Sequence, residues 1–555
     1  MKKRFITILL IFSVTISCNE SKWLEERAYD FYSADNSYVN ESQINAAVVK
    51  LYERIEPFYS FWPPYLGNAF FYTSDIAYDA IAITHQMNSY EDKLIPEMEM
   101  VSVFWQSFYK NISNANMIIN RIDGGYVEFT NEKQGLRLKA EAMFFRAFNY
   151  RFLGILYGGV PLVLDVVNEP KRDFVRNSES EVWDQVLEDL LFAEQYLPEV
   201  SELDQDGRLT KSAANHLLAE IYLIRKEYDM SIAASSKVID NPNFSLMTNR
   251  FGTSANDPGD VYWDLFRRGN QNRNGGVNSE AIWVKQYEYQ TEGADADYRL
   301  TWVLVPSYYL LKDEDGKSLF IGPTSKYGGD GGGWMVATDY MLHEVWQDDP
   351  NDMRNSSHNI IRDIAADNPE SKYYGRNIVE SGAINGFPNT LNRWWSAIFA
   401  KSTPINDFPK EVILDEATGL VSSGAQSTFR DHYIFRLAET HLLRAEAYLG
   451  KGELNKAAED INVVRARANA LPIAANDVSL DYILDERARE LNFEEPRLLT
   501  LMRMGKLVEK VKLHDPMHNG KYANHGISEK HGKWPIPQSE IERNTEAELE
   551  QNPDY

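Results

Sequence analysis

Two amphipathic segments joined by a glycine turn constrain the fold of this chain more than any other feature. Apolar residues recur every three to four positions through residues 433–470, on both sides of Gly450 and Gly452, which is the period of one face of an α-helix. Small, aromatic and large apolar residues fall at the offsets of a tetratricopeptide helix pair: Ala445, Tyr448, Gly452, Leu454 and Ala457. One such pair cannot bury both of its faces, so we expect related pairs elsewhere in the chain.

Three further segments repeat this spacing in degenerate form. The clearest begins at Ala219, where Tyr222 takes the place of Tyr448 and Lys226 replaces the turn glycine. The other two copies are the helix that contains Ala140 together with residues 182–197 and, more loosely, residues 41–56 together with 101–121. We therefore predict a mostly α-helical protein, built on a tetratricopeptide-like scaffold of about four degenerate helix pairs and interrupted by long, loop-rich insertions.

The start of the chain has the layout of a bacterial lipoprotein signal. A basic stretch, residues 1–4, precedes an apolar run over residues 5–16, and Cys18, the only cysteine of the chain, follows shortly after. The apolar run is too short to span a bilayer in the mature protein. We expect a signal peptide over residues 1–17, acylation of Cys18 and a lipidated tether over residues 18–40. An ordinary cleaved secretory signal with an incidental cysteine is the alternative.

The composition indicates a large globular protein and argues against nucleic acid as a partner. At 555 residues the chain exceeds the usual size of a single domain, and its hydrophobic content of 43% is typical of a globular protein. The formal net charge of −25 opposes nucleic-acid binding, because proteins that bind nucleic acid usually present basic faces. After the signal, no stretch of the sequence is long and apolar enough to cross a membrane.

Residues 241–429 differ in character from the helical segments on either side. Helical periodicity weakens there, glycine and asparagine become more frequent, and tryptophans gather: Trp263, Trp283, Trp302, Trp334, Trp346, Trp394 and Trp395. A flat aromatic ring can pack against the C–H face of a sugar while polar side chains hydrogen-bond the hydroxyl groups. Because loops on a rigid scaffold often carry binding residues, we expect a ligand site in this insertion.

The candidate ligand-binding residues follow from their sequence context. Trp62 and Tyr65 flank two prolines that forbid a regular helix, and Trp334 follows a glycine-rich run, so these rings are the ones expected to be exposed. Polar residues near such rings complete the set, which is Trp62, Tyr65, Asp75, Asn88, Tyr90, Arg299, Trp302, Trp334 and Trp394. Buried packing remains the alternative for each ring taken alone.

The sequence holds no persuasive catalytic set, and we predict a protein without enzymatic activity, cofactor or metal. His343 and Glu344 begin like the helix of a zinc protease, but Gln347 stands where the second histidine belongs. Residues 313–318 and 348–352 offer acidic oxygen ligands of the kind that calcium takes. Neither stretch has the spacing of an EF-hand, so solvated acidic turns are the expected alternative to a calcium site.

A set of motifs that runs in order to the last residue resembles the SusD/RagB family of Bacteroidetes outer-membrane lipoproteins. The motifs are residues 139–150 (KAEAMFFRAFNY), 157–161 (YGGVP), 208–214 (RLTKSAA), 436–439 (RLAE), 444–447 (RAEA), 460–467 (DINVVRAR), 486–491 (ERAREL) and 534–537 (WPIP). The closing residues 551–555 (QNPDY) resemble the family's Gln-Asn-Pro-Gly-Tyr end, with Asp554 where glycine is usual.

The resemblance implies a surface-exposed lipoprotein of the outer membrane that docks on a SusC-like TonB-dependent transporter. Family members capture an oligosaccharide, or in some cases a peptide, and pass it to that channel. On this basis residues 41–240 form an N-terminal SusD-like helical-repeat part, 241–429 the insertion, and 430–555 a C-terminal part with the last helix pair. We expect a glycan-binding protein; the alternatives are a peptide-capturing protein and a structural lid of the transporter that has no ligand site of its own.

Overall fold

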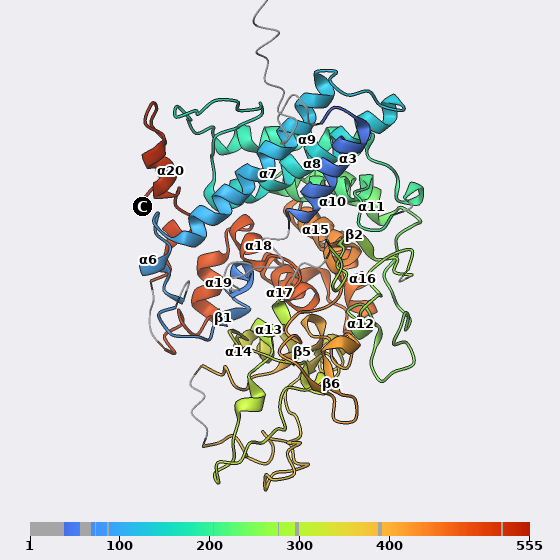
Figure 1. Cartoon of the computed structure of the whole chain (residues 1–555), viewed down its shortest axis with the longest axis vertical. Helices are drawn as coiled ribbons and strands as arrows, with labels where there is room; N and C mark the ends of the chain where they lie inside the picture. The colour runs from blue at the N-terminus through green and yellow to red at the C-terminus, as the bar shows by residue number, and fades with distance from the viewer. Residues whose placement is uncertain are drawn as a thin grey trace, which may run out of the picture.

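A computed structural model describes residues 38–55, 68–72, 74–85, 88–203, 205–275, 277–292, 294, 299–386, 391–522 and 526–555. Cys18, Trp62 and Tyr65 lie outside this described part. Helices fill the upper and middle parts of the molecule in Figure 1, and a lobe of loops with short helices and strands forms its lower end. Over the described ranges, no helix combines the length and the apolar character needed to cross a membrane.

Four helix pairs form the scaffold. Their members are α3 (Glu41–Glu53) with α7 (Glu99–Asp123), α8 (Glu132–Tyr157) with α9 (Glu179–Tyr196), α10 (Lys211–Ile224) with α11 (Tyr228–Ile239), and α15 (Leu437–Gly450) with α16 (Leu454–Arg467). Consecutive pairs pack on each other through α7 and α8, α9 and α10, and α11 and α15. The predicted mostly α-helical, tetratricopeptide-like scaffold is therefore confirmed.

The turns of two pairs are equivalent although only one contains glycine. Gly452, between α15 and α16, has a φ of 75°, and Lys226, at the same place between α10 and α11, has a φ of 59°. In both turns the following glutamate donates its backbone N–H to the tyrosine carbonyl, over 2.9 Å at Tyr448 and 2.8 Å at Tyr222. The pairing of Tyr222 with Tyr448 read from the sequence is thus correct, and Lys226 adopts the left-handed conformation that glycine takes at no steric cost.

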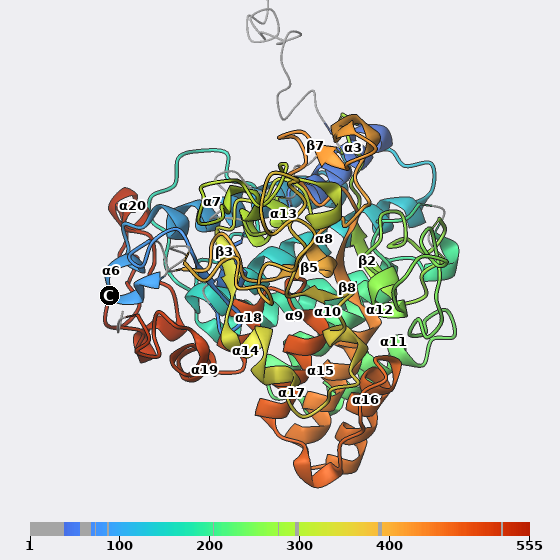
Figure 2. The same ribbon diagram turned by 90° about the horizontal axis from the view of Figure 1, so that it is seen from below.

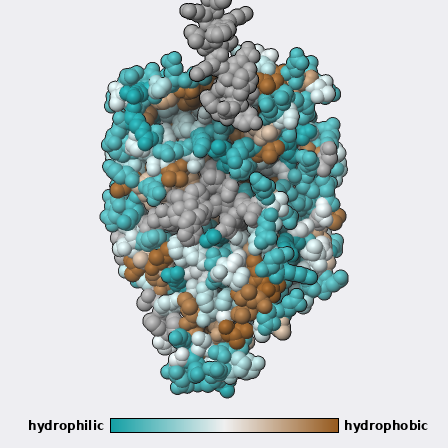
Figure 3. All heavy atoms as spheres, viewed as in Figure 1, coloured by the Kyte–Doolittle hydropathy of each residue, from teal (hydrophilic) through white to brown (hydrophobic). Residues whose placement is uncertain are grey.

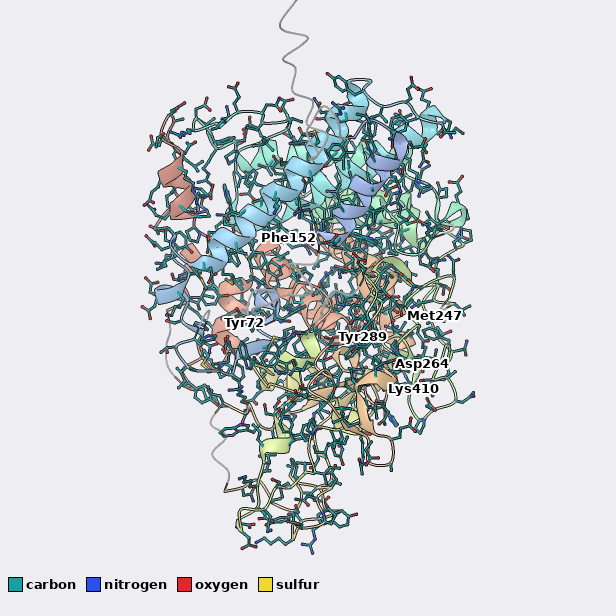
Figure 4. The ribbon with its side chains drawn as sticks, in the orientation of Figure 1. Tyr72, Phe152, Met247, Asp264, Tyr289 and Lys410 are labelled. Carbon is teal, nitrogen blue, oxygen red and sulfur yellow. The ribbon has the colours of Figure 1, made fainter. Side chains whose placement is uncertain are left out.

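The core of the scaffold is aromatic, and Trp283 is one of the insertion residues that belong to it. Phe152 of α8, labelled in Figure 4, stacks on Phe108 of α7 with ring centroids 5.1 Å apart. Trp283 is 1% exposed and meets Phe144 and Phe148 at 5.5 Å and 5.4 Å. Trp283 lies on β2 (Ala281–Lys285), which pairs with β8 (His432–Arg436) just before α15. Burial of this ring fixes the first strand of the insertion to the scaffold.

The insertion between α11 and α15 folds through short two-stranded antiparallel ladders. Besides β2 with β8, the described ladders are β1 (Ala77–Asp79) with β3 (Met335–Ala337), β4 (Ile360–Ile361) with β5 (Ile398–Phe399), and β6 (Ile413–Asp415) with β7 (Leu420–Val421). Its short helices are α12 (Val261–Asp264), α13 (Leu300–Leu304) and α14 (Asp339–Leu342). The β1–β3 ladder brings this insertion against a segment from the N-terminal part of the chain.

The described part of the chain contains six further α-helices outside the scaffold pairs and the insertion. They are α5 (Ala69–Tyr72), α6 (Tyr90–Lys93), α17 (Leu480–Leu491), α18 (Arg497–Arg503), α19 (Leu507–His514) and α20 (Gln538–Arg543). Figure 2 shows α15, α16 and α17 grouped at one edge, where α17 packs on both of its neighbours. The face drawn in Figure 3 is mostly hydrophilic with separate apolar patches.

A network of buried charges joins the insertion to α16 and α17. Glu490 of α17 accepts hydrogen bonds from Arg436 at 2.8 Å, from Arg354 at 3.0 Å and from Arg467. Arg354 also contacts Glu486 at 2.8 Å, and all five side chains are fully buried. Since Arg354 comes from the insertion and the carboxylates come from α17, these ion pairs fix the insertion against α17.

Candidate ligand-binding site

A glycine run and the short helix α13 build the surface that presents the site. The N–H of Gly332 donates to the carbonyl of Trp302 over 2.6 Å, and the N–H of Gly333 donates to Val305 over 2.9 Å. A Cβ atom on Gly332 would lie 2.7 Å from the indole of Trp302. Glycine is therefore required for the run to lie directly against α13. In Figure 1, α13 and α14 lie beside β1, and both helices pack on β3.

Two tryptophans meet at this surface. The ring centroids of Trp302 and Trp334 are 4.7 Å apart, with the rings tilted by 48°. Both side chains are half-buried, so each keeps part of its surface open to solvent. The backbone of Trp334 is held by the N–H of Ala80, which donates to its carbonyl over 2.7 Å. The pair thus forms an anchored aromatic platform of the kind that stacks on the apolar face of a ring.

Polar side chains from four separate segments lie beside the platform. Tyr309 donates its hydroxyl to Asp330 over 2.7 Å, and Gln426 donates its side-chain amide to the other oxygen of Asp330, also over 2.7 Å. Arg393 donates to the carbonyl of Gly332 over 2.8 Å. Burial raises the pKa of Tyr309, and the bond to Asp330 raises it further, so the phenol stays a donor at neutral pH. All four side chains are half-buried, with hydrogen-bonding capacity left for a ligand.

Three polar or aromatic residues expected at the site are buried structural residues instead. Asp75 is 0% exposed, and both of its oxygens accept hydrogen bonds from Arg497 at 2.8 Å and 2.7 Å. Asn88 accepts from the N–H of Asp79 over 3.1 Å and donates back to its carbonyl over 2.7 Å. Tyr90 is also 0% exposed. The expectation that these side chains face a ligand is corrected here, because buried charges and amides are satisfied within the fold.

The other expected residues lie nearer to the platform. Arg299 directly precedes α13 and is half-buried. Trp394 is half-buried and packs against the small core of the insertion that contains Trp395 and Ile398. Of the tryptophans proposed as ligand contacts, the structure therefore brings Trp302 and Trp334 together.

Sequence reasoning missed the polar half of this arrangement. Asp330 stands inside the glycine run that precedes Trp334, and its position as the one charged residue of that run could have marked it. No local sequence feature identifies Tyr309 and Gln426, since they are 21 and 96 residues away from Asp330. No local pattern predicts that these two side chains meet the same carboxylate.

The acidic stretches considered for calcium are occupied by protein contacts. One oxygen of Asp313 accepts the N–H groups of Asp315 and Lys317, at 3.1 Å and 2.9 Å, which is the geometry of an acidic turn. Asp352 forms an ion pair with Arg354 at 2.6 Å. Within the described ranges, no group of three or more His, Cys, Asp or Glu side chains is arranged to hold a metal ion.

The fold defines a tetratricopeptide-like helical-repeat protein whose loop-rich insertion carries an aromatic platform. Residues 263–555 match the model of the SusD family, and residues 22–223 match a second model described as "Starch-binding associating with outer membrane". The chain therefore belongs to the SusD/RagB family, as its motifs indicated.

Relatives match over most of their length. The SusD-like protein P25 of Formosa agariphila is 27% identical over 97% of this chain and 96% of its own. The starch-binding protein SusD of Bacteroides thetaiotaomicron is 24% identical over 80% of this chain and 77% of its own.

Solved structures of the family share the fold. A laminarin-binding SusD-like protein aligns with a TM-score of 0.66 and 22% identity over 93% of this chain and 100% of its own. The surface glycan-binding protein A of Bacteroides thetaiotaomicron, in complex with laminarihexaose, aligns with a TM-score of 0.66 and 20% identity over 92% of this chain and 99% of its own.

Proposed function

We propose that this protein binds a glycan at the cell surface and delivers it to a SusC-like TonB-dependent transporter of the outer membrane. The observation that carries the proposal is the half-buried pair Trp302 and Trp334 beside Asp330. The tilted indoles offer a surface for the C–H face of a sugar, and Asp330, Gln426 and Arg393 offer acceptors and donors for its hydroxyl groups. Relatives named for binding starch and laminarin support the same ligand class.

The proposal includes anchoring and the absence of turnover. Lipidation of Cys18 would hold the protein to the outer membrane, in keeping with the family described as associating with that membrane. The half-buried side chains of the platform suit binding, which needs complementarity to the bound sugar rather than to a transition state. Recognition by stacking and a few hydrogen bonds gives weak affinity for each site, and the ligand can then be released to the channel.

A binding measurement with Trp334→Ala tests the proposal. The soluble protein from residue 19 is screened against a glycan array and a peptide library, and the hits are titrated by calorimetry. We expect binding to one polysaccharide class, weakened about tenfold or more by Trp334→Ala, which corresponds to ~1.4 kcal/mol. The melting temperature should change little because the ring is half-buried.

Tyr374→Ala is the matched control, since Tyr374 is an aromatic residue that is 59% exposed and lies outside the platform. This variant should bind like the wild type. Binding of peptides without glycans would favour peptide capture. Equal affinity of Trp334→Ala and the wild type for the glycan, with impaired assembly on the transporter, would favour a structural lid.

A further inference from the structure

An aromatic-lined cavity lies on another part of the molecule, between α7, the segment of residues 161–174 and the last residues of the chain. Its volume is about 410 Å³, within the range of small-ligand sites. Trp105 and Tyr109 of α7 line it on one wall, and Phe174 and Leu549 also contribute to its lining. Figure 1 shows α20 beside α7 at the upper left, away from α13 and β1, and the two helices are in contact.

The walls of this cavity are held in place by specific hydrogen bonds. Asn544 accepts from the N–H of Phe174 and donates to its carbonyl, both over 2.8 Å. The N–H of Glu546 donates to the carbonyl of Arg172 over 2.8 Å, and Gln106 donates to Glu540 over 3.2 Å. Three segments far apart in sequence are thus fixed around the space. Because the walls are already fixed, a ligand that enters the cavity causes little additional ordering of the protein, which lowers the entropic cost of binding.

The rings of Trp105 and Tyr109 are arranged relative to each other like those of the Trp302–Trp334 platform, although Trp105 is buried and Tyr109 is half-buried. The rings of Trp105 and Tyr109 are 5.0 Å apart and tilted by 46°, against 4.7 Å and 48° for the platform. The hydroxyl of Tyr109 donates to the carbonyl of Pro161 over 2.8 Å, and burial raises the pKa of Tyr109, so the ring stays neutral. The wall is therefore a fixed, uncharged aromatic surface.

The polar residues that line the cavity indicate a neutral, hydroxyl-rich ligand. Gln106, Ser113 and Lys171 supply donors, and Asp165 and Glu540 supply carboxylate acceptors. The two carboxylates disfavour an anion, and Lys171 and Arg543, which also line the cavity, disfavour a cation. Glu540 already pairs with Gln106 and Arg543, and Lys171 pairs with Asp173, so the polar part of the lining is in place before a ligand binds. A sugar ring matches both the aromatic and the polar parts of the lining, because it has an apolar C–H face and hydroxyl groups that donate and accept hydrogen bonds.

We propose that this cavity is a second saccharide-binding site, for the end or a short stretch of a neutral glycan; the inference rests on the glycan-binding function proposed above. Two sites on one rigid molecule raise the local concentration of a long polysaccharide at each, so the chain is retained more tightly than by either site alone.

Calorimetric titration of the wild type and of Ser113→Trp with laminarihexaose and with maltohexaose tests this site. Ser113 is exposed on α7 and lines the cavity, so the indole fills the space without removing a wall. Asn120→Trp, at another exposed polar position of α7, is the matched control. We expect about two equivalents of sugar on the wild type and on Asn120→Trp. About one equivalent should remain on Ser113→Trp and on Trp334→Ala, and about none on the double variant.

The outcomes separate the two proposals. One equivalent on the wild type, lost in Trp334→Ala and kept in Ser113→Trp, would overturn the second site and leave the proposed function standing. Binding that survives Trp334→Ala and disappears in Ser113→Trp would support the cavity and overturn the platform. A wild type that binds neither sugar nor any other glycan of the array would contradict both proposals.

Discussion

Gly332 decides where the indole of Trp302 can lie. The backbone of the glycine run touches α13 so closely that a single added methyl group would stand 2.7 Å from the ring. Tryptophan is bulky and rigid, so it cannot yield without turning out of its contact with Trp334. Gly332, which has no side chain, therefore controls how the indole rings of Trp302 and Trp334 lie against each other.

Replacement of Gly332 by alanine should weaken glycan binding several-fold, because the methyl group displaces Trp302 from the platform. Calorimetric titration measures the affinity, and near-ultraviolet circular dichroism reports the change in tryptophan packing. Gly532→Ala is the control, since a Cβ atom there meets open space. An unchanged affinity of Gly332→Ala would mean that the contact between Trp302 and Trp334 is irrelevant to binding.

At the same scale, sequence and structure agree on rings more than on polar groups. Trp334, which follows a glycine run, was expected to be exposed, and its side chain is half-buried. Asp75 was chosen by proximity to aromatic residues, but its partner Arg497 lies 422 positions away. Whether a carboxylate is a ligand contact or half of a buried ion pair depends on such a distant partner.

At the scale of elements, the pair α15–α16 shows how small residues set the spacing of helices. Ala445 of α15 and Ala457 of α16 belong to the same buried cluster and are both 0% exposed. Gly450 plays the same part toward α11, because a Cβ atom there would lie 2.4 Å from the ring of Tyr228. The helix pairs stack at short range because these positions lack bulk.

Ala457→Leu should destabilise the protein by about 1–3 kcal/mol, because extra methylene groups must enter a filled interface. Denaturation by urea measures the change. Asn455→Leu, at an exposed position of the same helix, should stay within about 0.5 kcal/mol of the wild type. A neutral result for Ala457→Leu would contradict close packing of this pair.

At the scale of the whole molecule, the network of buried charges connects the scaffold to the insertion. Glu490 contacts three arginines, from the insertion, β8 and α16, at one point of α17. Ion pairs of this kind contribute modestly when complete, but removal of one partner leaves uncompensated charge in the interior. The network therefore makes the orientation of the insertion specific.

Glu490→Gln should cost about 3–5 kcal/mol, since three buried arginines lose a shared carboxylate. Thermal and chemical denaturation measure the loss. Glu459→Gln, on the exposed side of α16, is the control and should be nearly neutral. Equal stability of the two variants would contradict the role of this charge network in holding the insertion against the scaffold.

Acid should weaken the same network of buried ion pairs. Burial opposes ionisation of Glu486, but Arg354, Arg489 and Arg465 outweigh it and hold its pKa at about 2; the pKa of Glu490 is also lowered, mainly by Arg467 and Arg436 against burial. Since the unfolded value is about 4.3, both carboxylates stabilise the fold above about pH 4, and this contribution is lost as the pH falls toward 2.

We expect the free energy of unfolding of the wild type to fall over this window by more than that of Glu490→Gln, which lacks one of the titrating groups. Urea denaturation at a series of pH values measures both. Parallel curves for the two proteins between about pH 4 and pH 2 would show that Glu490 does not contribute to the acid response.

The sequence by itself determined the helix pairs, the turn at Lys226 and the glycine run that precedes Trp334. These features depend on neighbours within a few positions, where helical period, turn geometry and glycine content act directly. Tertiary structure alone decided that Trp283 is core, that Asp75 is half of an ion pair, and that Tyr309 and Gln426 hold Asp330. The physical reason is that burial and polar satisfaction are set by residues brought together from distant segments, and a periodic pattern contains no record of which segments meet.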